Sequence, residues 1–171
     1  MGRYDTSAWQ KIHTLCSFYG VQENDIKQKA KKVLSLYSDL VLLVRIEDLT
    51  DADYEWSVKN QLDALNFLEN IDQNKSDLFY SSYHILNEVW FGDIVDDAIV
   101  RLADFQDGPL YVHILSKCYL TKCDMDEEEL AKEFNIERTR IYDRKREAII
   151  MFGICFWFYA IPQRRAYLMK Q

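Results

Sequence analysis

The feature that most constrains the fold is a long uncharged segment near the C-terminus, residues 148–163. Within it, residues 149–161 have the sequence IIMFGICFWFYAI, which is apolar on every face of a helix. This stretch is shorter than the roughly 20 residues that a helix needs to span a bilayer. A helix that is apolar all round is buried all round. The segment therefore predicts a core helix, covered by the rest of the chain or by a second copy of it, and we expect Pro162 to end it.

Turn-forming residues are scarce along the whole chain. The 171 residues include 5 Gly and 2 Pro, too few for the many turns of a β-sandwich or barrel, while 49% of residues are apolar. The sequence therefore predicts an all-α fold with a substantial core, built as one compact domain or two small ones.

Apolar residues recur at helical spacing in three stretches of the N-terminal part, residues 25–46, 50–71 and 76–105. We expect Asn24 or Asp25 to cap the first helix. Residues 50–53 resemble a capping box and are expected to begin the second helix. Gly92 and Asp93 are expected to break or bend the third.

The clearest turn is the tripeptide Asp107, Gly108, Pro109. We expect Gly108 to supply a positive φ and Pro109 to lie in the first turn of the next helix, predicted over residues 110–120. We place a domain boundary at this turn. Residues 1–107 are then a helical N-terminal bundle for dimerisation or partner binding, and residues 108–171 are a helix-turn-helix domain with a long apolar final helix.

Residues 126–149, DEEELAKEFNIERTRIYDRKREAI, have the pattern of a helix-turn-helix. Ala131 is small where the second helix would cross the first, and Asn135 tolerates the positive φ that the turn requires. The apolar positions predicted to fill the corner are Leu130, Phe134, Ile136 and Ile141. Two residues depart from the usual pattern: Glu137 replaces a capping Ser or Thr, and Arg144 replaces an inward apolar residue.

The outward side of the second helix is the candidate DNA-binding surface. Base edges in the major groove would be contacted by Arg138, Thr139, Tyr142, Asp143 and Arg146, and phosphates by Arg140 and Lys145. Arg138 or Arg146 is the candidate for guanine. The alternative is an ordinary helical hairpin whose basic helix is merely solvated.

Charge is distributed unevenly along the sequence. The chain carries −7 overall, which alone argues against generic binding to a polyanion. Residues 137–171, however, hold eight basic and three acidic side chains, a net charge of +5, so the preceding residues carry −12. This asymmetry favours DNA binding by the C-terminal part.

The helix-turn-helix resembles sigma-factor region 4 and, more closely, the late-transcription activators of the ArpU type found in phages and prophages of low-GC Gram-positive bacteria. The resemblance covers residues 126–149, within which residues 136–149, IERTRIYDRKREAI, match the motif without a gap. The layout, a helical N-terminal part before a C-terminal motif, is similar as well. It implies a transcription regulator, acting on phage late genes, that binds promoter double-stranded DNA and contacts RNA polymerase. A homodimer would present two recognition helices to two half-sites.

A protein-binding adaptor is the alternative from another class: a sigma-like factor or inhibitor that docks on RNA polymerase rather than on DNA. Catalysis is not expected, because the sequence holds no phosphate-binding Gly-rich loop, Walker signature or nucleophile elbow. We expect no catalytic, cofactor-binding or metal-binding residues and no membrane contact. No export signal begins the sequence, and its four Cys are scattered, so we expect the cytoplasm of a bacterial host.

Overall fold

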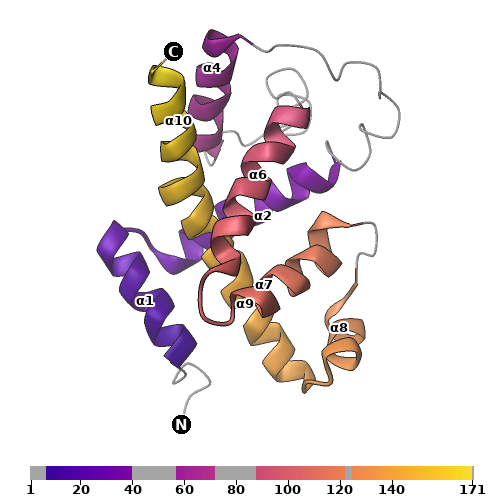
Figure 1. Ribbon diagram of the computed structural model, residues 1–171. Helices are drawn as coiled ribbons and strands as arrows, with labels where there is room; N and C mark the ends of the chain where they lie inside the picture. The colour runs from indigo at the N-terminus through magenta and orange to yellow at the C-terminus, as the bar shows by residue number, and fades with distance from the viewer. Residues whose placement is uncertain (1–6, 40–56, 72–87, 122–124, 171) are drawn as a thin grey trace.

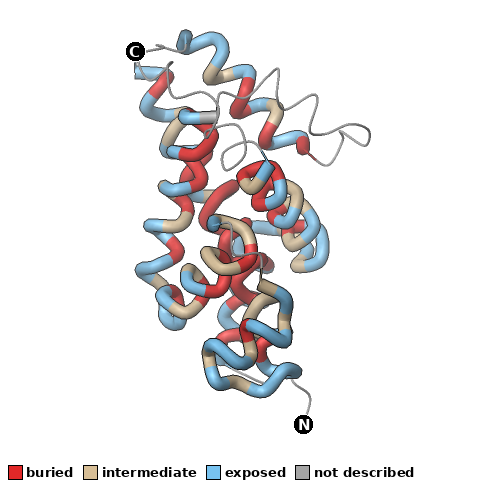
Figure 2. Tube along the Cα trace, turned by 90° about the vertical axis from the view of Figure 1, so that its right-hand side faces the viewer, coloured by how far each residue is buried: buried red, intermediate tan, exposed pale blue. Residues whose placement is uncertain are grey.

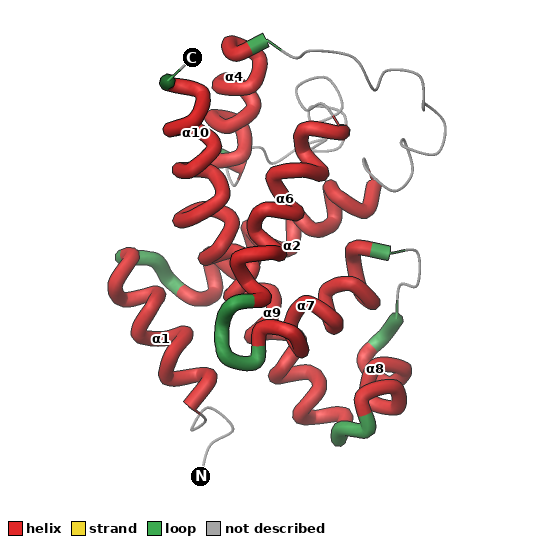
Figure 3. Tube along the Cα trace, in the orientation of Figure 1, coloured by secondary structure: helices red, strands yellow, loops and turns green. Residues whose placement is uncertain are grey.

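The computed structural model describes residues 7–39, 57–71, 88–121 and 125–170, and every secondary-structure element in these ranges is helical (Figures 1 and 3). This confirms the predicted all-α fold. The elements are α1 (Ser7–Tyr19), α2 (Glu23–Leu36), α4 (Val58–Glu69), α6 (Glu88–Ala103), α7 (Gly108–Leu115), the π-helical turn η3 (Ser116–Leu120), α8 (Glu127–Phe134), α9 (Arg138–Cys155), the π-helical turn η4 (Phe156–Ala160) and α10 (Ile161–Met169).

The centre of the molecule is the uncharged segment. Helix α9 continues through η4 into α10 and runs from the α8 end of the molecule to the end that holds α4 (Figure 1). Helices α1, α2, α6 and α7 pack around α9, and α4 packs against α10. Every residue from 147 to 157 is buried. Figure 2 shows the buried, red parts of the chain gathered along the middle of the molecule. The chain therefore covers residues 147–157 by itself, without a second copy, whereas Phe158 is partly buried and Tyr159 is exposed.

Pro162 does not end the central helix, so this expectation is wrong. It lies in the first turn of α10, directly after η4, where the Ile161 N–H donates to the Phe156 carbonyl. A proline lacks the N–H for an α-helical hydrogen bond, and its ring crowds the preceding turn. The wider π-helical turn interrupts the α-helical pattern just before Pro162, so the helix continues past it.

Two other sequence-based boundaries also need correction. Helix α2 begins at Glu23 after Gln22, so Asn24 and Asp25 lie inside its first turn and do not cap it. Helix α6 runs unbroken through Gly92 and Asp93. A helical glycine costs only about 1 kcal/mol relative to alanine, and the buried neighbours on this helix outweigh that cost. The predicted helix starts at residues 50–53 and 76 lie outside the described residues.

The turn before α7 has the predicted position but a different conformation. Asp107 has the positive φ, 62°, rather than Gly108. Gly108 is required for space, because a Cβ there would lie 2.3 Å from the Leu102 carbonyl oxygen. Pro109 lies in the first turn of α7, as expected.

One hydrophobic core crosses the predicted domain boundary at this turn. Buried residues of α1, α2, α4 and α6 pack in the same cluster as those of α7, α9 and α10. The two predicted regions therefore share their main core in the structure. No helix in the described part of the chain has the length and apolar character needed to cross a membrane.

The Gly108 position gives a direct test of the turn geometry. We expect Gly108→Ala to lower the free energy of unfolding by about 1–3 kcal/mol, because the new methyl group meets backbone atoms that cannot rotate away. Asp107→Gly should change it by less than about 1 kcal/mol, since glycine accepts positive φ but is more flexible when unfolded. Urea unfolding of both variants measures the difference, and an equal cost at both positions would contradict this account.

Candidate nucleic-acid interface

The predicted helix-turn-helix is present in the structure as α8 and α9. Asp126 caps α8, its Oδ1 accepting a hydrogen bond of 2.8 Å from the Glu129 N–H. Asn135 ends α8 with φ 53° and ψ 46°, the left-handed conformation that the turn was predicted to need. The Ile136 N–H then donates to the Ala131 carbonyl at 3.0 Å. The chain is thereby turned sharply from one helix into the next.

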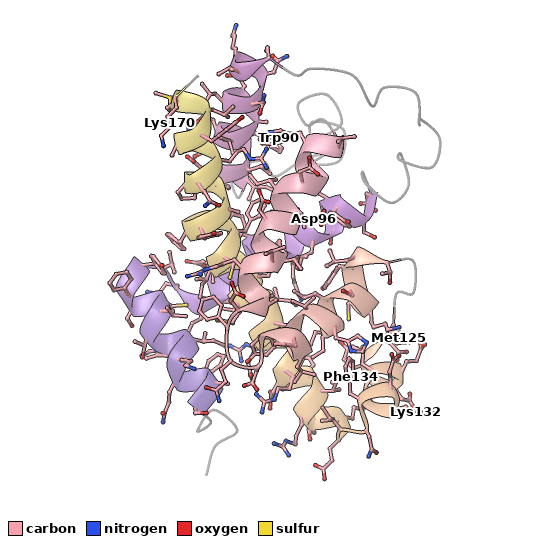
Figure 4. All side chains as sticks on the ribbon, viewed as in Figure 1. Trp90, Asp96, Met125, Lys132, Phe134 and Lys170 are labelled. Atoms are coloured by element: carbon pink, nitrogen blue, oxygen red, sulfur yellow. The ribbon has the colours of Figure 1, made fainter. Side chains whose placement is uncertain are left out.

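A small second core fixes the angle between the two helices. It consists of the buried residues Ile114, Cys118, Leu130 and Ile141, with Ala131, Phe134 and Ile136 partly buried against it. The predicted inward residues thus all pack in the corner, although Phe134 and Ile136 keep some exposure. Figure 4 shows Phe134 on the inner side of α8 and Lys132 on its outer side. The ring of His113 in α7 packs edge-on against the Phe134 ring, with 4.6 Å between the ring centres.

Ion pairs hold α8 in place around this core. Lys145 Nζ of α9 lies 3.0 Å from Glu127 Oε1, and Lys117 Nζ of η3 lies 3.3 Å from Glu133 Oε1. The hydrogen bond from Lys145 is the largest influence on the Glu127 carboxyl, and it holds the pKa of Glu127 below its usual value. Burial alone would lower the pKa of Lys145, but the hydrogen bond to Glu127 and nearby groups raise it.

Four of the predicted DNA-binding residues lie exposed at the start of α9. They are Arg138, Thr139, Arg140 and Tyr142. Tyr142 is 50% exposed to solvent, although large aromatic side chains are usually more buried. These residues span the first turn and a half of α9, the part of a recognition helix that contacts base edges in known motifs of this kind. Glu137 precedes them without a side-chain capping bond, as its residue type suggested.

The other three predicted residues are less accessible. Asp143, Lys145 and Arg146 are all partly buried. Lys145 is bound to Glu127. The Arg146 guanidinium lies 4.8 Å from the centre of the Trp9 ring in α1. The exposed part of the candidate surface is therefore shorter than the sequence predicted, and Arg138 is the more exposed of the two guanine candidates.

Arg144 has a structural partner that explains its unusual position. Its Nη1 donates to Glu147 Oε1 at 2.8 Å, and the Tyr111 hydroxyl of α7 donates to the same oxygen at 2.9 Å. Glu147 is only 4% exposed. Burial, followed by the nearby Glu147 charge, raises the pKa of Tyr111. This network ties α9 to α7 at the depth where the helix passes from solvent into the core.

Sequence reasoning missed two basic residues beside the exposed start of α9. Lys27 and Lys31 of α2 line a shallow groove together with Tyr142, Lys145 and Arg146 of α9. The signal for them is the short basic run KQKAKK at residues 27–32, which stands out in an acidic region.

The basic charge of the C-terminal part is correspondingly not one patch. Arg164 pairs with Asp97 of α6 at 2.9 Å, and Arg165 pairs with Glu69 of α4. Helix α10, which carries both arginines, runs away from α8 toward the end of the molecule that holds α4 (Figure 1). The positive surface at the helix-turn-helix thus comes from the start of α9 and from α2.

The described residues contain no group of three or more His, Cys, Asp or Glu side chains placed to hold a metal ion. Comparison of the chain with protein-family models, with curated proteins and with solved structures found no match. The candidate site therefore depends on its own geometry, a braced basic helix at one end of an acidic molecule.

The buried network around Glu147 should contribute more to stability than a surface ion pair. We expect Glu147→Leu to lower the free energy of unfolding by about 2–4 kcal/mol, because Arg144 and Tyr111 both lose their acceptor. Tyr111→Phe removes one bond and should cost about 1–2 kcal/mol. Arg165→Gln, at the exposed pair with Glu69, is the control and should cost less than about 1 kcal/mol. Equal costs for all three variants would contradict the assigned role.

The Glu127–Lys145 pair should make stability depend on pH. Because the folded pKa of Glu127 is lowered, its contribution is present above the unfolded value and is lost as pH falls through the folded value. We expect Glu127→Gln to be less stable than wild type by up to about 1 kcal/mol near pH 7, with the difference shrinking toward about pH 3. Urea titrations across this range measure it. A stability difference between Glu127→Gln and wild type that stays constant across this range would contradict the assigned pair.

Proposed function

We propose that this protein is a sequence-specific DNA-binding regulator of transcription, in which the exposed start of α9 enters the major groove of a duplex. The observation that supports it is the combination of the Asn135 turn with the exposed side chains of Arg138, Thr139, Arg140 and Tyr142. A helix braced at this corner presents its N-terminal residues at a fixed angle. Such an arrangement is what recognition of base edges needs.

The roles of the individual residues follow from their positions. Arg138 is exposed on the first turn of α9 and is the residue proposed to bind the O6 and N7 atoms of a guanine. Arg140 is proposed to hold a phosphate at the flank. Lys145 is assigned a structural role instead of its predicted phosphate contact, since its Nζ already binds Glu127. Arg146 is likewise positioned by Trp9 rather than directed at a base.

The resemblance to ArpU-type activators supports a finer form of the proposal. In this form the chain activates phage or prophage late genes in the cytoplasm of a bacterial host, at promoters used by RNA polymerase. The homodimer remains a prediction. Its original reason, the apolar segment, is satisfied within one chain, because residues 147–157 are buried by the chain's own helices.

The second candidate is an adaptor that docks on RNA polymerase through the same corner. The observation that favours it is the acidic first turn of α8, where Glu128 and Glu129 are exposed beside the recognition helix. The first helix of a helix-turn-helix lies across the DNA backbone, where two carboxylates oppose phosphates. The two candidates differ in salt dependence, since only DNA binding releases condensed counterions.

The decisive experiment is selection of duplexes from a random-sequence DNA pool by the wild-type protein, followed by titration with the enriched duplex. We expect Arg138→Ala to weaken binding to that duplex by about 1–3 kcal/mol and to relax preference at one base position. Lys170→Ala removes the same charge at the opposite end of the molecule and is the control (Figure 4).

Failure to enrich any sequence, together with negligible duplex binding at low salt, would contradict the proposed function. Co-purification with a polymerase subunit in that case would support the adaptor. Binding that is unaffected by Arg138→Ala would contradict the assigned recognition residue.

A further inference from the structure

The groove between α2 and α9 collects positive charge from both halves of the chain. Its described lining includes Lys27, Lys31, Glu127, Tyr142, Lys145 and Arg146. Glu127 is the one carboxylate among these lining residues, and it is already bound by Lys145. The lining thus holds four basic side chains and one carboxylate, and a groove with this excess of positive charge attracts an anion.

The two lysines are held at this site by close helix packing. Gly153 of α9 faces α2 so closely that a Cβ there would lie 2.9 Å from Ile26 Cγ1 and 3.2 Å from Ala30 Cβ. Lys27 and Lys31 follow these contact residues by one position each. They are also four residues apart, so they lie on one face of α2, one above the other. The backbone that carries them is thus fixed relative to the recognition helix.

Lys29, in the same basic run of α2, points elsewhere. Lys29 Nζ lies 4.7 Å from the centre of the Trp157 ring, against the central helix and outside the groove. The run KQKAKK thus divides by helical position, with Lys27 and Lys31 on the groove side.

Electrostatics in the groove favours a bound anion. Burial lowers the pKa of Lys27, and the neighbouring charges of Lys31 and Arg146 lower it further. A like-charged cluster of this kind is destabilised when empty and is relieved by a negative group between its members. Phosphate is the anion that a groove of lysine and arginine beside a recognition helix suits best.

The groove is continuous with the proposed recognition surface. Tyr142 lines the groove and also belongs to the exposed face that carries Arg138 and Thr139. A duplex whose major groove receives the start of α9 would bring the sugar-phosphate backbone beside this groove.

We propose that Lys27 and Lys31 of α2 bind backbone phosphates of the same duplex whose bases α9 contacts. The inference rests on the proposed function and extends it, because it assigns DNA contacts to the N-terminal region, which the sequence assigned to dimerisation or partner binding. These contacts are independent of sequence, since phosphates carry no base identity. They add affinity and fix the position of the protein along the duplex, while Arg138 discriminates between base sequences.

The test uses the double variant Lys27→Gln/Lys31→Gln in the full chain. Its matched control is Lys59→Gln/Lys170→Gln, which removes the same total charge from exposed positions on α4 and after α10. Affinity for the enriched duplex is measured between 50 and 200 mM salt. Thermal unfolding of each variant shows that it is folded.

Each phosphate contact adds about 0.9 to the slope of log affinity against log salt, so two contacts account for roughly a tenfold change over this salt range. We expect the groove variant to bind more weakly at 50 mM salt, with a slope smaller by about 2. Its enriched sequence should equal that of wild type, and the control should keep the wild-type slope.

Three results would overturn the inference. If the groove variant keeps the slope of the control, Lys27 and Lys31 do not contact phosphates, and the proposed function is unaffected. An altered sequence preference in the groove variant shows contact with bases instead of phosphates. A wild-type chain that binds no duplex overturns the proposed function and this inference together.

Discussion

Burial of the uncharged segment determines how the whole molecule is organised. The side chains of residues 149–157 are apolar, and burying each large one stabilises the folded state by about 1.5–3 kcal/mol. The other helices therefore pack around α9 and η4, and Gly153 lets α2 approach within van der Waals contact. The helix that forms the centre of the core is also the helix whose first turns reach solvent. Its orientation is consequently set by the main core as well as by the small corner under α8.

The change from solvent to core occurs within about two turns of α9, and polar groups are needed there. Tyr142 is half exposed, whereas Glu147, five residues later, is almost fully buried. A buried carboxylate is tolerated when it is paired and hydrogen-bonded. Arg144 and Tyr111 provide this, each bound to the same oxygen. The same network fixes the rotation of α9 about its axis, which determines which side chains of the first turns face outward.

Features that depend on neighbours in sequence could be predicted. Asn135 was expected to have positive φ because few other residue types tolerate it. Asp126 precedes α8 for an equally local reason, since its carboxylate caps a free N–H group of the first turn. The corner residues Leu130 and Ile141 followed from helical spacing. Local rules failed where packing decided the outcome. Gly92 lies inside an unbroken helix because its neighbours are buried, and Pro162 is accommodated by a π-helical turn.

The candidate site shows the same division. The exposure of Arg138 and Thr139 was predictable from the face of α9 on which they lie. The contact of Arg146 with Trp9 joins residues far apart in sequence, and so does the proximity of Lys27 to Tyr142. The spacing of residues within α9 does not predict which residues of α1 or α2 pack against it. Charge counting over residues 137–171 was similarly misleading, because Arg164 and Arg165 are neutralised by Asp97 and Glu69 at a distance from the helix-turn-helix.

The charge distribution bears on how selective the proposed DNA binding would be. Attraction of a protein to any duplex grows with its positive charge, whereas discrimination comes from contacts to base edges. A chain with net charge −7 repels DNA at most orientations, and the acidic first turn of α8 adds to this repulsion near the site. Attraction is then confined to the start of α9 and the lysines of α2. Lower affinity for arbitrary sequences raises the ratio of specific to non-specific binding, which is the quantity that decides occupancy among many competing sites. In the proposed function, the acidity that first argued against DNA binding therefore acts to confine it to one surface.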